Sequence, residues 1–154
     1  MKFLKIALAL ALGKFFLISC SDNSEDLTGC LEVLPPVYLS FNVLSAESER
    51  DVFFSTPPEY ELKDLYFFRS RDTNRSDTIR PKVEGSGEER FFRIEVDNTG
   101  RSDTLSMNIG ANSQDRLTVT IKNTDDVCPV PTIDKIHFNN TELIPENGKV
   151  KIRK

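Results

Sequence analysis

The sequence predicts an all-β fold, a single antiparallel β-sandwich, from three features of this 154-residue chain. Short alternations of apolar and polar residues recur from Val37 onward, and this two-residue period is typical of half-buried strands. Turn-forming residues separate the alternations about every ten positions. No stretch repeats apolar residues at helical spacing over three turns. We therefore expect eight or nine short strands.

The first half of the chain beyond the leader holds five short stretches with strand character, from which some of the eight or nine strands are expected to form. The clearest is Val37–Val43, and the compact apolar run Leu65–Phe68 is consistent with a central strand. Pro81 interrupts the next segment, and because proline has no N–H to donate, we expect an edge strand or bulge there. The five segments are residues 37–43, 52–54, 65–68, 78–80 and 82–84.

The second half continues the pattern, with Asn139-Asn140 as one turn signal and Asn147-Gly148 as a strong hairpin signal. This layout favours an immunoglobulin-like or transthyretin-like sandwich over residues 30–154, with a small barrel as the alternative. The expected strand segments in this half are residues 92–96, 105–109, 117–121, 136–138, 143–144 and 149–152.

The first nineteen residues read as a targeting peptide. Lys2 and Lys5 form a basic start, an apolar run follows, and Cys20 ends the stretch. Its three lysines and no acid leave 17 basic and 24 acidic residues in the remaining 135, a net charge of −7. Such a balance disfavours nucleic acid as a partner.

Leu17-Ile18-Ser19-Cys20 resembles the lipobox of bacterial lipoproteins. The resemblance implies lipid on Cys20 and cleavage before it, so that residues 1–19 are a signal peptide and 20–29 a lipidated tether. Lys14 interrupts the apolar run, which is too short to span a bilayer of about 30 Å as a helix. An ordinary secretory peptide is the alternative.

The acidic tract Ser21–Asp26 resembles the export signal that takes lipoproteins of Bacteroidota to the outer face of the outer membrane. A solvated tether is the plainer interpretation. The whole layout resembles the small β-sandwich lipoproteins of that phylum. The resemblance implies an outer-membrane protein, surface-exposed or facing the periplasm, with a binding or structural role.

Two cysteines remain once Cys20 carries lipid. In an exported protein Cys30 and Cys128 are more often paired than free, and we expect a disulfide between them. Closing so long a loop stabilises a fold by about 4–5 kcal/mol in the loop-entropy model. Metal binding and a cofactor are not expected, because the two cysteines are far apart and His137 is the only histidine.

One seven-residue pattern occurs twice, as Thr73–Ile79 and as Thr99–Leu105. Reuse of good turn chemistry is one explanation. The other is modification, because the Asp-Thr-aliphatic cores around Thr78 and Thr104 resemble sites at which Bacteroidota O-glycosylate exported proteins. Both threonines are therefore candidate glycosylation sites.

No catalytic constellation stands out. His137 is isolated, no Gly-x-Ser-x-Gly motif occurs, and the acids of 97–103 do not follow the EF-hand pattern. We therefore expect no enzyme. A small hydrolase, which would need an acidic pair or His137 in a cleft, is the least favoured reading.

Three phenylalanine doublets, 53-54, 67-68 and 91-92, occur in a chain without tryptophan. In a strand each doublet directs one ring to either face, so an exposed ring would offer a platform to a partner or sugar. Core packing is favoured, since phenylalanine is usually buried. We expect a non-catalytic module that docks another envelope protein through a sheet edge or loop face. A glycan-binding surface lipoprotein that assists carbohydrate capture is the alternative.

Overall fold

The computed structural model describes residues 33–110 and 114–154. The chain divides into two units, residues 1–30 and 31–154, and all described residues belong to the second. These residues form nine β-strands and two short 3-10 helices, with no α-helix among them. The all-β prediction is confirmed.

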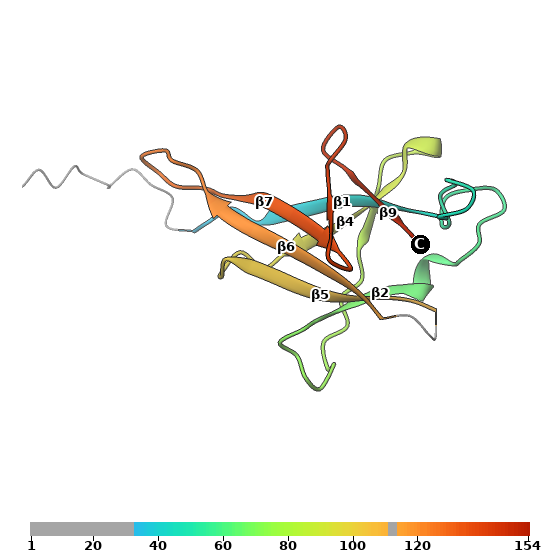
Figure 1. Ribbon diagram of the computed structural model, residues 1–154, viewed down its shortest axis with the longest axis horizontal. Helices are drawn as coiled ribbons and strands as arrows, with labels where there is room; N and C mark the ends of the chain where they lie inside the picture. Colours follow the sequence, from blue (N-terminus) through green and yellow to red (C-terminus); the bar gives the residue numbers. More distant parts are fainter. Residues whose placement is uncertain (1–32, 111–113) are drawn as a thin grey trace, which may run out of the picture. The chain divides into compact units, whose positions relative to one another are not determined.

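The strands form two sheets, one of four strands in the order β3-β4-β1-β9 and one of five in the order β2-β5-β6-β7-β8 (Figure 1). Two separate sheets make a sandwich rather than a barrel. The elements are β1 (Val37–Leu44), η1 (Leu62–Asp64), β2 (Leu65–Arg69), β3 (Lys82–Glu84), η2 (Gly87–Glu89), β4 (Phe91–Val96), β5 (Ser102–Ile109), β6 (Asp115–Asn123), β7 (Pro131–Phe138), β8 (Thr141–Leu143) and β9 (Val150–Arg153).

The order of the first six strands is that of strands B to G in an immunoglobulin sandwich. The run β3-β4-β1 corresponds to D-E-B, and β2-β5-β6 corresponds to C-F-G. The place of strand A, beside B, is taken by β9, which arrives from the end of the chain. It runs parallel to β1, whereas the other six strand pairs are antiparallel. One mixed sheet thus departs from the purely antiparallel arrangement that we predicted.

A cluster of phenylalanine rings fills the core between the sheets. The Phe92 ring of β4 lies 5.5 Å from Phe41, 5.1 Å from Phe53 and 4.8 Å from Phe54, measured between ring centroids. Phe67 of the other sheet meets Phe41 edge-on at 5.8 Å. All five rings are buried. Aromatic burial on this scale dominates the energetics of so small a core.

Residues 52–54 form a turn, so the prediction of a strand there was wrong. The Oδ1 atom of Asp51 accepts hydrogen bonds from the N–H groups of Phe53 and Phe54, both at 2.8 Å, and this side chain holds the turn. Both rings consequently enter the core. The other two doublets behave as strands do: Phe67 and Phe92 are buried, while their neighbours are half-buried on the outer faces.

The edge predicted around Pro81 is confirmed, because β3 is the outermost strand of its sheet. Ile79 first pairs with Phe67 of the opposite sheet through two main-chain bonds of 2.8 and 2.9 Å. The chain then passes Pro81 and changes sheets. The turns at Asn139-Asn140 and Asn147-Gly148 have positive φ at all four residues, as two-residue hairpin turns require.

Candidate functional site: an open groove between two strand edges

An apolar groove of about 350 Å³ lies where the first half of β1 faces β7 and the chain segment that leads from β8 to β9. Leu39 and Ile136 are buried at its floor, and Ile144 is 82% exposed. We call it the β1–β7 groove. Its lining is Tyr38, Leu39, Ser40, Ile133, Asp134, Lys135, Ile136, Glu142, Leu143, Ile144, Pro145, Gly148 and Val150.

The first edge of the groove is the half of β1 that β9 does not reach. The four-residue β9 pairs with Phe41–Leu44 only, so no other described strand lies beside Val37–Ser40 on that side. On its opposite side the same segment pairs with β4. An edge of this kind presents unpaired N–H and C=O groups to any extended chain that approaches it.

The main-chain groups that face the groove can be assigned. Alternate residues of a strand direct both their N–H and C=O to the same side. The Val43 carbonyl accepts a bond from Val52 on the side of β4, whereas the Leu44 carbonyl accepts one from Lys154 at the end of β9. Even-numbered residues of β1 therefore face β9 and the groove, and the N–H groups of Tyr38 and Ser40 point into it.

The second edge is the first half of β7. The three-residue β8 pairs only with Ile136–Phe138, so within residues 114–154 and 33–110 no strand pairs with Pro131–Lys135 on this side. The main chain of Ile121 in β6 points away from β7, because its N–H donates to the Arg101 carbonyl on the side of β5. Ile133 of β7 lies opposite Ile121 in the ladder. The main-chain groups of Ile133 therefore point away from β6 and toward the groove.

The opposite side of the sandwich, formed by β2 and β4, is closed by side chains. The Arg69 guanidinium places Nε 3.4 Å from Oδ2 of Asp103, and its Nη2 donates to the Glu95 carbonyl at 3.4 Å. The same Asp103 oxygen accepts the Asp97 N–H at 2.9 Å. Asp103 is only 5% exposed, and these contacts join β2 and β5 of one sheet to β4 of the other. We call this set the Arg69–Asp103 clasp.

Asp97 belongs to the turn beside the clasp. Hydrogen bonds from the Thr99 N–H and hydroxyl, at 3.0 and 2.7 Å, hold the pKa of the Asp97 carboxyl below its ordinary value of 3.8. The Arg71 guanidinium, which forms an ion pair with the same carboxylate, lowers it further. This carboxylate is a structural group, charged over the whole physiological range.

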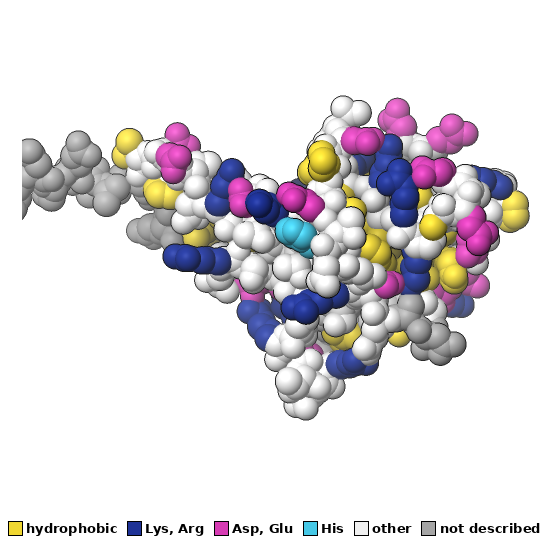
Figure 2. All heavy atoms as spheres, in the orientation of Figure 1, with side chains coloured by type: hydrophobic (Ala, Val, Ile, Leu, Met, Phe, Trp, Pro, Cys, Tyr) yellow, Lys and Arg dark blue, Asp and Glu magenta, His cyan; other side chains and the backbone are white. Residues whose placement is uncertain are grey.

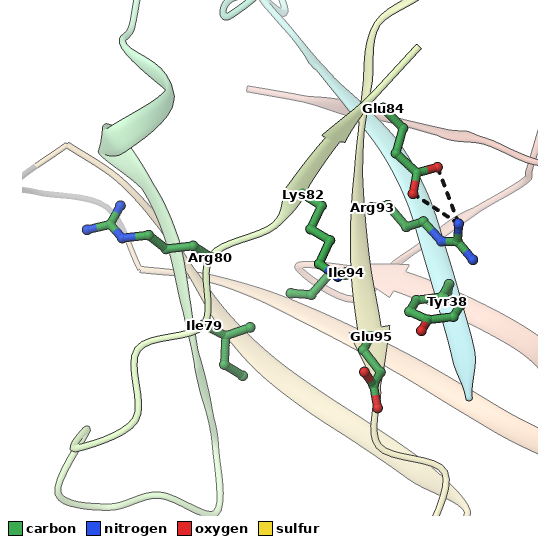
Figure 3. A pocket seen from close by; sticks show the side chains of 8 residues that line it. All are labelled: Tyr38, Ile79, Arg80, Lys82, Glu84, Arg93, Ile94 and Glu95. Atoms are coloured by element: carbon green, nitrogen blue, oxygen red, sulfur yellow. Dashed lines mark hydrogen bonds and ion pairs between the residues drawn. The ribbon is translucent and has the colours of Figure 1, made fainter. Parts of the chain in front are cut away.

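A second hollow, of about 270 Å³, lies beside Tyr38 on the outer face of the four-stranded sheet (Figure 3). The Arg93 guanidinium lies 3.9 Å from the Tyr38 ring centroid and donates to both carboxylate oxygens of Glu84, at 3.0 and 3.3 Å. Arg80 points away from the hollow and donates to the Lys63 carbonyl. The guanidinium covers one face of the ring, so a sugar could not stack there without displacing it.

The two outward rings of the doublets also have cationic neighbours. The Lys149 ammonium lies 4.0 Å from the Phe91 ring centroid, and the Arg75 guanidinium 5.8 Å from that of Phe68. Tyr66 meets Phe68 edge-on at 5.6 Å. Two of the three doublets, 67-68 and 91-92, therefore contribute one ring each to the outer faces, and glycan binding by these rings stays a prediction.

The predicted site residues do not converge on one place. Cys20 and Cys30 lie outside the described residues, so lipidation and the Cys30–Cys128 disulfide stay predictions. Cys128 is half-buried in the loop between β6 and β7. Thr78 is exposed in the loop that precedes Ile79, and Thr104 is half-buried on β5 with its hydroxyl 3.4 Å from that of Thr118. Both remain candidates for glycosylation.

No metal centre emerges from the part of the chain that the structure describes. His137 lies half-buried on β7, paired in register with Thr118 and Glu142, on a face where basic and acidic side chains are mixed (Figure 2). Among residues 33–110 and 114–154, no three His, Cys, Asp or Glu side chains gather as metal ligands would. No helix in these ranges is long and apolar enough to cross a membrane.

Comparison with known proteins adds no identification. No protein-family model, no curated protein and no solved structure matches the chain. The groove is therefore the feature on which a functional argument can be built. Sequence reasoning anticipated a sheet edge as a docking surface but not which edge, because the lengths of β8 and β9 relative to their neighbours decide it.

Proposed function

We propose that this protein is a membrane-anchored, non-catalytic docking module of the cell envelope, which binds another envelope protein at the β1–β7 groove. One observation carries the proposal: two strand edges without a described partner, at Val37–Ser40 and Pro131–Lys135, face one apolar groove. Main-chain pairing at a sheet edge gives affinity, and pockets for alternate side chains give specificity.

The anchor in this proposal is the lipid expected on Cys20, and the compartment is the outer membrane. The tether expected over residues 20–29 would reach roughly 17 Å if it behaved as a flexible ten-residue linker. The module would thus work close to the bilayer, where its partners are other envelope proteins. Mass spectrometry of the native protein should find an acylated Cys20 at the amino terminus, and an unmodified residue there would remove the anchor from the proposal.

The Cys30–Cys128 disulfide completes the proposal. It would tie the chain that enters β1 to the loop between β6 and β7. Peptide mapping without reduction should recover Cys30 and Cys128 in one cross-linked fragment. Two separately alkylated cysteines would contradict it.

The docking role can be tested in native membranes with a photo-crosslinking amino acid in place of Lys135, which lines the groove. Lys63 is a matched control, since it is an exposed lysine on η1, away from the groove. We expect a discrete cross-linked protein from position 135 and none of the same mass from position 63. No adduct from position 135, or equal adducts from both, would contradict a docking role for the groove.

A further inference from the structure

The shape of the β1–β7 groove defines what kind of segment can enter it. β1 and β7 begin at the same end of the sandwich (Figure 1). The start of β1 pairs with the end of β4, and the end of β4 contacts the start of β5. The start of β5 pairs with the last part of β6, and the end of β6 pairs with the start of β7. The two edges therefore run in one direction. A single extended segment can lie along both, whereas a helix could not meet the N–H groups of Tyr38 and Ser40.

The position beside Val37–Ser40, where a longer β9 would lie, has no described strand. In the immunoglobulin order, strand A lies beside B along its length. Here β9 occupies only the stretch beside Phe41–Leu44. The unfilled half offers the Tyr38 N–H and C=O and the Ser40 N–H. Antiparallel pairing is the more stable ladder per residue, and it is the arrangement of six of the seven strand pairs already present.

The side chains around the groove set the chemistry of the occupant. Inward, it would meet Leu39, Ile133 and Ile136, which favour apolar side chains. The charged lining residues nearly balance: Asp134 is paired with Lys122 at 3.1 Å, and Lys135 and Glu142 carry opposite charges. A segment with a high charge of one sign would be attracted to one of Lys135 and Glu142 and repelled by the other, so it would gain little from either. An uncharged strand is complementary to this groove.

We infer that the occupant is a short, uncharged β-strand from another envelope protein, which pairs antiparallel with Tyr38 and Ser40 and extends the line of β9. Its alternate side chains are apolar and face Leu39 and Ile136. This inference rests on the proposed function, which asks only whether the groove binds a partner. It adds the conformation, direction and composition of the bound segment.

The direction is tested by placing the photo-crosslinker at Tyr38 or at Ser40, whose side chains share one face of β1 two residues apart. Mass spectrometry then maps the partner residue reached from each position. In an antiparallel strand, the residue reached from position 40 precedes that reached from position 38 by about two positions. Both should fall in one uncharged segment of alternating apolar residues.

Ser40→Pro gives a second, independent readout, since it removes the Ser40 N–H that faces the groove but no N–H that pairs with β4. With the crosslinker at position 135, Ser40→Pro should lower the yield at least fivefold, as the loss of a hydrogen bond of about 1 kcal/mol predicts. Ser40→Ala is the matched control and should leave the yield unchanged.

Several results would overturn the inference. If the partner residue reached from position 40 follows the one reached from position 38, the bound strand is parallel to β1. If the cross-links fall on distant segments of the partner, the groove binds a folded surface. Cross-links to residues before Val33 of the same chain show that its own segment fills the groove. If position 135 gives adducts and positions 38 and 40 give none, the groove binds a partner, but the partner does not pair with β1 as a strand. A failure of the docking role itself would instead appear as no adduct from position 135, or as equal adducts from positions 135 and 63.

Discussion

The two lateral sides of this sandwich differ in how the sheets meet. On the side of β2 and β4, the Arg69–Asp103 clasp and the crossing chain at Ile79 join the sheets. On the side of β1 and β7, two strand edges face a groove without a described strand between them. The closed side has hydrogen bonds across the interface, whereas the open side keeps main-chain groups available. The Arg69–Asp103 clasp and the proposed docking groove thus lie on opposite sides of one small domain.

The largest loss of stability is expected in the phenylalanine cluster that lies between the two sheets. Phe92→Ala removes a ring that is 1% exposed and contacts three other phenylalanines. We expect the free energy of unfolding to fall by about 3–5 kcal/mol. Urea unfolding measures it. Phe68→Ala is the control, because its half-buried ring should cost much less, and equal losses would contradict the assignment of the core.

The clasp itself should be the next most sensitive feature. Asp103→Ala deprives Arg69 of its charge partner and the Asp97 N–H of its acceptor. Leaving such groups buried and unpaired should cost about 2–4 kcal/mol. The exposed Glu49–Arg153 pair is the contrast: Glu49→Gln should leave the unfolding curve almost unchanged. If the two substitutions behave alike, the clasp does not close this side.

The turn that delivers β9 to the open side should have an intermediate effect. Gly148 has φ +76°, and no atom lies within 4 Å of the position a Cβ would take. Gly148→Ala therefore costs only the conformational penalty of about 1–2 kcal/mol. Thermal unfolding should show the loss, and Asn147→Gly should be tolerated at the neighbouring position. An unchanged melting temperature for Gly148→Ala would contradict the turn geometry.

Acid should weaken the closed side through Asp97. Since the pKa of this carboxyl is lowered in the folded protein, its contribution is present above the unfolded value and is lost as pH falls through the folded value. The free energy of unfolding should thus decline from about pH 5 downward. Asp97→Asn should flatten that decline in urea titrations at pH 7 and pH 3. An identical decline in wild type and variant would refute the role of Asp97.

The smallest effect on stability is expected on the open side. Ser40→Pro removes an N–H that has no described partner, so the free energy of unfolding should change by less than about 1 kcal/mol. Leu39→Pro, one residue away, removes an N–H directed at β4 and should destabilise far more. Comparable losses from the two prolines would mean that the edge assignment of β1 is wrong.

Most of the strands could be predicted from the sequence, because alternation at Val37–Val43 and Leu117–Ile121 records which side chains enter the core. The turn at 52–54 could not, since its conformation depends on one Asp51 carboxylate that competes with strand pairing. The groove also could not be predicted from the sequence. It exists because β8 and β9 are shorter than the edges they cover, and register between strands far apart in the chain leaves no local pattern.

Amide hydrogen exchange measured by NMR on the purified domain shows whether the β1 edge is open. An open edge should give alternation: fast exchange at Tyr38 and Ser40, whose N–H groups face the groove, and slow exchange at Leu39 and Phe41, whose N–H groups pair with β4. Protection of all four amides to a similar degree would show that a strand already covers this edge, and the edge would not be open to a partner.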